Sequence, residues 1–179
     1  MDVYVRGLPT PVERSALKVG NVFCSYGDDG TVFVVLAIGS RDAEAAKYGV
    51  VAGVILATLN APANVLFELW SLQRFPDPVA LVNGTLSVRP VALGDGSLSP
   101  ISPPMHGPKQ GQILIRPDGT ACVVAREPMR ATVVVELETG LTSKTVGGIC
   151  YKEWELWIDW DEEHSSRLFG PDDLPAATT

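Results

Sequence analysis

The stretch DWDEEH holds the densest group of side chains that could do chemistry. Asp159, Asp161, Glu163 and His164 offer carboxylates and an imidazole, which serve as metal ligands or as general acids and bases. A calcium loop of the EF-hand kind starting at Asp159 fails, because His164 takes the sixth position, which requires Gly, and Gly170 the twelfth, which requires Glu. We interpret the stretch as a solvated acidic strand end, keep these four residues as weak metal candidates, and expect no cofactor.

Nucleophilic catalysis requires a nucleophile beside a base. The two histidines, His106 and His164, do not adjoin a Ser or Cys in a recognisable motif. The sequence contains neither GxSxG nor a glycine-rich phosphate-binding motif. No catalytic residue is therefore assigned, and an enzyme acting in a cleft is the less favoured hypothesis.

Three cysteines are widely spaced, and none belongs to a CxxC pair: Cys24, Cys122 and Cys150. A zinc site built on cysteine usually needs such pairs. Each Cys lies in an apolar stretch typical of a strand. We interpret them as reduced thiols of the core, with a disulfide between two of them as the alternative.

Tryptophans are the remaining candidates for a site. The string WELWIDW alternates, so it predicts a strand with Trp160 on the buried face and Trp157 on the outer face beside carboxylates. The earlier string FELWSL places Trp70 in the same way. We predict Trp70, Trp157 and Trp160 as interface residues, because Trp is frequent at binding hot spots. The alternative is that Trp70 and Trp157 face each other inside the molecule.

The two Trp strings belong to a wider internal similarity. KVGNVFCSYGDDGTVFVVLAI (Lys18–Ile38) resembles KQGQILIRPDGTACVVAREP (Lys109–Pro128), and each half then continues to its Glu-Leu-Trp. Such ordered similarity indicates a duplicated unit. Asp29-Gly30 and Asp118-Gly119 predict a β-hairpin in each half, because Gly accepts positive φ.

Further elements follow from composition and pattern. ATVVVELETG predicts a third strand in the second half, and VVAGVILATL predicts its counterpart, with a helix as the alternative. RDAEAAKY has helix-forming composition, and Asn83-Gly84 predicts another hairpin. The segment between the halves is rich in Gly, Ser and Pro, which is typical of a linker.

These patterns divide the chain into five parts. They are an N-terminal arm (1–17), a first β unit (18–93), a linker (94–107), a second β unit (108–163) and a C-terminal arm (164–179). The predicted fold class is all-β with minor α: two tandem, related small barrels or sandwiches. The strand order resembles, in outline, SH3-like small barrels and toxin ribonucleases of the MazF/PemK kind, but the catalytic pattern of such toxins is not found.

The net charge of −7 argues against sequence-blind binding of nucleic acid, which needs Lys and Arg. No signal peptide is seen, and the most apolar run, Gly49–Leu59, is too short for the roughly 20 residues of a membrane span. We expect a cytoplasmic protein, or a virion protein if its origin is viral. The favoured function is a non-catalytic interaction or assembly protein with a protein partner or its own copies, for example part of a phage or virus particle. The alternatives are a hydrolase or nuclease-like enzyme and an acidic inhibitor of a basic protein.

Overall fold

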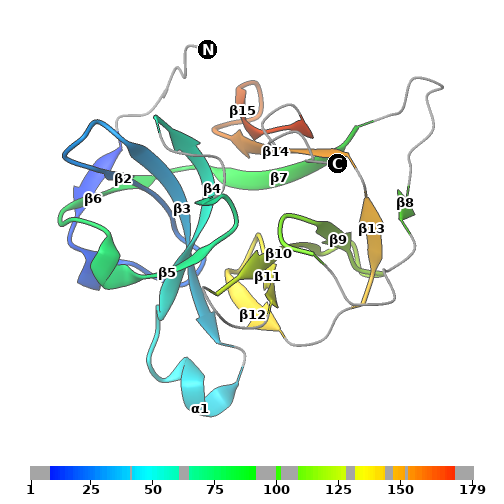
Figure 1. Cartoon of the computed structure of the whole chain (residues 1–179), viewed down its shortest axis with the longest axis horizontal. Coiled ribbons are helices and arrows are strands. Elements are labelled where there is room, and N and C mark those ends of the chain that lie inside the picture. Colours follow the sequence, from blue (N-terminus) through cyan, green and yellow to red (C-terminus); the bar gives the residue numbers. More distant parts are fainter. Residues whose placement is uncertain are drawn as a thin grey trace.

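The computed structural model describes residues 9–40, 42–60, 65–91, 100–101, 109–127, 132–143, 147–151 and 153–171. These residues form β-strands with one four-residue α-helix, α1 (Ala43–Ala46). The strands make two sheets that are not closed into a barrel (Figure 1). The all-β class and the short helix are confirmed, whereas the barrel form of the prediction is wrong. No helix in this part of the chain has the length and apolar character to cross a bilayer.

The strands of the first half are β1 (Thr10–Val12), β2 (Val22–Tyr26), β3 (Val32–Ser40), β4 (Ala52–Leu59), β5 (Leu69–Ser71), β6 (Val79–Val82) and β7 (Thr85–Pro90). Those of the second half are β8 (Pro100–Ile101), β9 (Ile113–Ile115), β10 (Ala121–Arg126), β11 (Thr132–Glu136), β12 (Leu141–Ser143), β13 (Ile149–Tyr151), β14 (Trp154–Asp159) and β15 (Ser165–Phe169).

The larger sheet has twelve strands in the order β1-β6-β2-β3-β12-β11-β10-β9-β13-β8, with β4 on β3 and β5 on β4. The smaller sheet has the order β15-β14-β7 and lies across the top of the view in Figure 1. Both sheets contain strands of both halves. The halves therefore share their sheets rather than forming separate ones.

Both predicted hairpins are confirmed: β2 pairs with β3, and β9 pairs with β10. In each turn an Asp carboxylate accepts the backbone N–H two residues later, from Thr31 to Asp29 at 3.0 Å and from Thr120 to Asp118 at 2.9 Å. Hydrogen bonds from Thr31, first from its side chain and then from its backbone N–H, lower the pKa of Asp29, and those from Thr120, first from its backbone N–H, lower the pKa of Asp118. The Asp-Gly signal thus works through a side-chain cap of the turn.

The residues ahead of each hairpin also make matching backbone hydrogen bonds. The Gly20 N–H donates to the Ala37 carbonyl at 2.8 Å, and the Gly111 N–H donates to the Val124 carbonyl at 2.8 Å. Both glycines have positive φ, which most side chains avoid. The similarity of the Lys18 and Lys109 stretches therefore has a counterpart in backbone geometry.

Matching contacts also join the two halves. The Gly39 N–H at the end of β3 donates to the Gly140 carbonyl at 3.1 Å, and the Arg126 N–H at the end of β10 donates to the Phe67 carbonyl at 2.9 Å. The acceptors Gly140 and Phe67 both have positive φ, of 69° and 62°. Beside these bonds β12 runs parallel to β3, and Glu68 forms a parallel bridge to Arg126.

The two Glu-Leu-Trp strings, in contrast, occupy different places. The Leu and Trp of the first lie in β5, which pairs with β4 in the larger sheet. The second forms β14, which pairs with β7 and β15 in the smaller sheet. The prediction that both strings are the same late strand of a repeated unit is wrong.

Asn83 and Gly84 do not form the predicted hairpin. β6 pairs with β1 and β2, whereas β7 leaves for the smaller sheet and pairs with β14. A Cβ on Gly84 would lie 2.7 Å from Ile158 Cγ1, so Gly permits a close approach at this corner. The Asn-Gly pair therefore marks the place where the chain changes sheet. Local sequence does not distinguish such a corner from a hairpin turn.

The largest cluster of buried side chains combines both halves; among others it contains Leu36, Leu56, Ile113, Val135 and Leu156. Two smaller clusters lie within one half each, around Phe23 and Phe75 in the first and around Leu114 and Cys122 in the second. All three cysteines are buried and lie outside any disulfide, so their predicted place in the core is confirmed. A shared core means that the halves depend on each other for burial.

The predicted arms and linker contribute strands where they are described. In the N-terminal arm, Thr10–Val12 pairs with β6 as β1, and Arg14 binds Asp77 through the guanidinium Nε at 2.8 Å. Residues 100–101 of the linker pair with β13, and the rest of it up to residue 107 lies outside the described residues. In the C-terminal arm, Ser165–Phe169 pairs with β14.

Candidate functional site

The smaller sheet has one buried and one outward face. Trp154, Leu156 and Ile158 of β14 are buried, whereas Glu155, Trp157 and Asp159 are only partly so. The predicted alternation is confirmed, and it places an indole in the middle of a polar face. We call the outward residues Thr85, Ser87, Arg89, Glu155, Trp157, Asp159, Ser165 and Arg167 the outer face.

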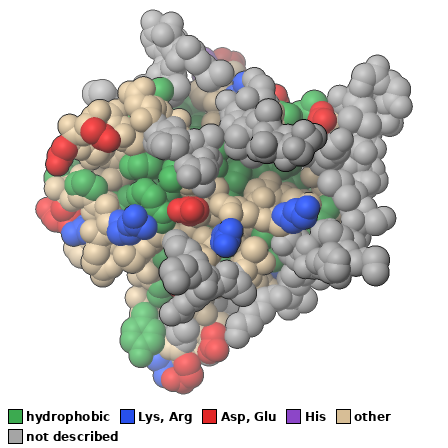
Figure 2. Space-filling model, viewed as in Figure 1, with side chains coloured by type: hydrophobic (Ala, Val, Ile, Leu, Met, Phe, Trp, Pro, Cys, Tyr) green, Lys and Arg blue, Asp and Glu red, His purple; other side chains and the backbone are tan. Residues whose placement is uncertain are grey.

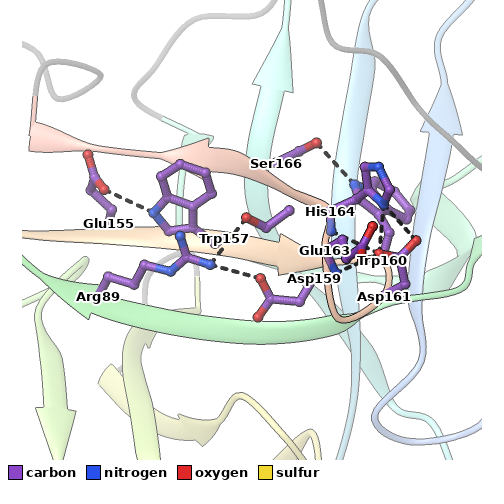
Figure 3. Close-up of polar contacts among 10 residues, drawn as sticks. Arg89, Glu155, Trp157, Asp159, Trp160, Asp161, Glu163, His164 and Ser166 are labelled. Atoms are coloured by element: carbon purple, nitrogen blue, oxygen red, sulfur yellow. Dashed lines mark hydrogen bonds and ion pairs between the residues drawn. The ribbon is translucent and has the colours of Figure 1, made fainter.

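Trp157 is held on the outer face by polar neighbours (Figure 3). Its indole N–H donates to Glu155 Oε2 at 2.9 Å, two residues earlier on the same face. The guanidinium carbon of Arg89 lies 4.2 Å from the centre of the indole ring, within the range of a cation–π contact. The carboxylate and the guanidinium explain how a Trp is accommodated among charges.

Two ion pairs position these groups in turn. Arg89 Nη2 donates to Asp159 Oδ1 at 2.9 Å and to Ser165 Oγ at 3.3 Å. Arg167 Nη1 donates to Glu155 Oε1 at 3.2 Å. The two guanidinium groups and two carboxylates fix one another, so the outer face is preorganised and locally balanced in charge.

The acidic turn after β14 is a compact local structure. Asp161 Oδ1 accepts the backbone N–H of Glu163 at 2.9 Å and of His164 at 2.8 Å, and His164 Nδ1 lies 2.7 Å from the same oxygen. The pKa of Asp161 is lowered, first by the hydrogen bond from the Glu163 N–H and then by His164. An imidazole held by a carboxylate could act as a general base.

This turn borders an open hollow of about 410 Å³, lined by Arg89, Asp159, Asp161, Glu162, Glu163, His164 and Ser165. Of the four predicted metal candidates, Asp159 binds Arg89 and Asp161 binds His164. The described part of the chain contains no group of three or more His, Cys, Asp or Glu arranged to hold a metal ion. The structure therefore brings the candidates to one rim without making a metal centre of them.

Trp70 has the same local arrangement in the larger sheet. Its indole N–H donates to Glu68 Oε2 at 3.0 Å, and Arg74 lies 4.1 Å from the ring centre. Its ring also packs against Phe33 and Phe75, with centroids 5.1 and 5.8 Å away. These surroundings differ from those of Trp157, so the alternative in which the two indoles face each other is wrong.

Trp160, the third predicted interface residue, packs partly buried against the shared core. Its indole N–H donates to Ser166 Oγ at 3.0 Å. This partner sits on β15, so Trp160 closes the end of the β14–β15 hairpin. Of the three tryptophans, Trp157 alone lies in the middle of the outer face.

Sequence reasoning missed Arg89 and Arg167. They lie on β7 and β15, and strand pairing places Arg167 opposite Trp157 and Arg89 opposite Glu155. The only signal was a cation in each of two strand-like stretches. Against protein-family models, curated proteins and solved structures, the chain matches none. A function must therefore be argued from the residues themselves.

Proposed function

We propose that this protein is a non-catalytic interaction or assembly protein that binds a protein partner through the outer face. The observation that carries this proposal is the position of Trp157 beneath Arg89. The Arg89 guanidinium is held by its ion pair with Asp159, and Glu155, which accepts the indole N–H, is held by its ion pair with Arg167. Trp and Arg are the residues most enriched at binding hot spots. A side chain already held in place loses little conformational entropy on binding, which favours affinity.

The partner is a protein of the same complex or another copy of this chain, in a cytoplasmic assembly or in a phage or virus particle. The net charge of −7 supports protein over nucleic acid. The local balance of two Arg and two carboxylates on the outer face supports a partner with a similarly mixed polar surface around an apolar centre.

The proposal is tested by Trp157→Ala and Arg89→Ala, with Tyr48→Ala as a matched control. Tyr48 is 79% exposed and lies beyond α1, away from the smaller sheet. The native mass is measured by light scattering, together with the protein that co-purifies with the tagged chain. We expect both outer-face variants to lose assembly or partner while the far-ultraviolet spectrum and the control stay unchanged. An unaltered complex in both variants would contradict the proposal.

A second candidate is an enzyme with its site at the hollow beside the acidic turn. The Asp161–His164 pair, 2.7 Å apart, supports it. His164→Ala separates the two functions. It should abolish turnover of a tested ester, phosphodiester or peptide if His164 is a base, and it should leave assembly unchanged if the outer face is the functional site.

We also infer that the two halves arose by duplication, with β1 to β7 corresponding to β8 to β14. The inference is supported by the matching Asp-Gly turns of the two hairpins and by the matching backbone hydrogen bonds of Gly20 and Gly111. It is also supported by reciprocal contacts between the halves, because Phe67 and Gly140 each accept a backbone N–H from the other half. β7 and β14, which correspond in this order, pair with each other antiparallel, as a two-fold arrangement requires. Superposition of the halves in an experimental structure tests it.

A further inference from the structure

The first hairpin is longer than its counterpart. β2 and β3 form five cross-strand pairs, whereas β9 and β10 form three. The additional pairs are Ser25 with Phe33 and Tyr26 with Val32, next to the turn. The first hairpin therefore extends beyond the part of the fold that both halves have in common.

The extension carries an exposed apolar row. Tyr26 lies opposite Val32, and Val32 lies opposite Leu59 of β4, so the three side chains share one face. Tyr26 is 51% exposed and Leu59 is 52% exposed. Asp28 and Asp29, both exposed, form the adjoining turn. We call these five residues the hairpin lip.

The lip is fixed in position. Asn60, which follows β4, donates from Nδ2 to the Gly30 carbonyl at 3.2 Å and so ties the end of β4 to the turn. The Asp29 carboxylate accepts the Thr31 N–H. In Figure 2 acidic side chains stand at the upper left of the molecule, the side on which β2 and β3 lie. An apolar row is thus presented next to two carboxylates.

We propose that the hairpin lip is a docking surface for a basic, apolar segment of a partner protein. An apolar side chain of the segment covers Tyr26 and Leu59, and a Lys or Arg beside it lies near Asp28 and Asp29. In a two-fold contact of two lips the same two carboxylates would meet, and this repulsion disfavours a second copy of this acidic chain. The same repulsion acts against phosphate backbones and anionic lipid. The proposal goes beyond the outer face, because it concerns another surface and states the charge of the partner.

The test is a two-dimensional amide NMR titration of the full chain with peptides of about eight residues, the length of an ordinary strand. One peptide alternates Lys with Leu, a second alternates Glu with Leu, and a third alternates Lys with Ser. We expect saturable shifts at residues 26–31 and 58–60 with the Lys/Leu peptide, weakened by salt. The other two peptides should leave the chemical shifts of these amides unchanged.

Variants separate the apolar from the ionic contribution. Tyr26→Ser and Leu59→Ser should each raise the dissociation constant by about fivefold or more, the usual effect of losing an interface anchor. The matched controls are Tyr48→Ser and Ile149→Ser, whose side chains are 79% and 52% exposed elsewhere. The control substitutions should change the dissociation constant by less than about twofold, because substitutions at unrelated surface positions usually have small effects. Asp28→Asn keeps the apolar row and should reduce the salt dependence.

Three results would overturn the proposal. Equal shifts with the Glu/Leu peptide would show that charge is not recognised. Shifts spread over the surface, or equal losses in the controls, would show a general attraction to an acidic protein. A rise in native mass that Tyr26→Ser abolishes would assign the lip to a second copy. None of these outcomes involves Trp157 or Arg89, so the outer-face proposal is decided separately.

Discussion

The buried ion pair between Arg116 and Glu136 offers the sharpest test of how a buried charge contributes to the stability of this fold. Glu136 is 2% exposed, pairs with Arg116, and accepts a hydrogen bond from Thr139 Oγ1 at 2.8 Å. Arg116→Ala removes the cation and leaves a buried carboxylate. Breaking such a pair costs about 3–5 kcal/mol. The hydrogen bond from Thr139 is retained and reduces this cost. We therefore expect the free energy of unfolding to fall by about 3 kcal/mol, near the lower end of the range.

Replacing both partners should behave differently. Arg116→Met with Glu136→Leu removes both charges together, and such replacements are often neutral or stabilising by about 1–4 kcal/mol. The first half supports this expectation. Ile55, buried opposite Val35, takes the place in β4 that Glu136 takes opposite Cys122 in β11. An aliphatic side chain is therefore compatible with this position of the fold.

The measurement is urea unfolding followed by tryptophan fluorescence, analysed as a double-mutant cycle with the two single variants. Arg89→Ala is the matched control, because its ion pair with Asp159 is partly exposed and should contribute less than about 1 kcal/mol. A loss below about 1 kcal/mol in Arg116→Ala would refute the reasoning, and so would a double variant as unstable as the sum of the singles.

Three further predictions follow from the described contacts. Burial raises the pKa of the Cys24 thiol from 9.0 to about 11, so its contribution to stability is complete below pH 9 and lost as the pH rises through 11. Relative to Cys24→Ala, the wild type should lose on the order of 2 kcal/mol of unfolding free energy over that interval. Hydrogen bonds from Arg14 lower the pKa of Asp77, so the amides of β1 should have lower hydrogen-exchange protection factors, corrected for the intrinsic rate at each pH, in Asp77→Asn, and in the wild type once the pH falls below 3.8. Deleting 25–26 with 32–33 should preserve the fold, since two residues per arm restore the shorter hairpin. Deleting only one cross-strand pair should be more destabilising, as measured by thermal unfolding. Pairs in an antiparallel ladder alternate between hydrogen-bonded and non-hydrogen-bonded, so this deletion would attach the turn to a pair of the wrong kind.

The local elements could be predicted from the sequence because their causes are local. An Asp and a Gly make each hairpin turn, and the alternation in Trp154–Asp159 depends only on the two-residue period of a strand. The same holds for Trp157, whose carboxylate partner lies two residues away. These features require no knowledge of what the strands pack against.

The long-range pairing could not be predicted in this way. Nothing near Asn83-Gly84 indicates that β7 leaves the larger sheet, and only the pairing of β7 with β14 brings Arg89 to Trp157. The shared core has the same origin, because each half exposes an apolar face that the other half covers. Apolar periodicity predicts that such a face is buried, not which segment buries it.

The repeated Glu-Leu-Trp string shows how local and global similarity separate. In extended backbone the Glu and the Trp share a face, so the carboxylate can accept the indole N–H, as it does at 3.0 Å for Trp70 and at 2.9 Å for Trp157. An Arg covers the ring in both places, although it follows β5 in sequence in one and comes from β7 in the other. The two strings therefore share a local arrangement that holds an indole between a carboxylate and a guanidinium, and this arrangement needs no common origin. The support for duplication rests instead on Gly20 and Gly111, whose matching backbone bonds depend on the placement of whole strands.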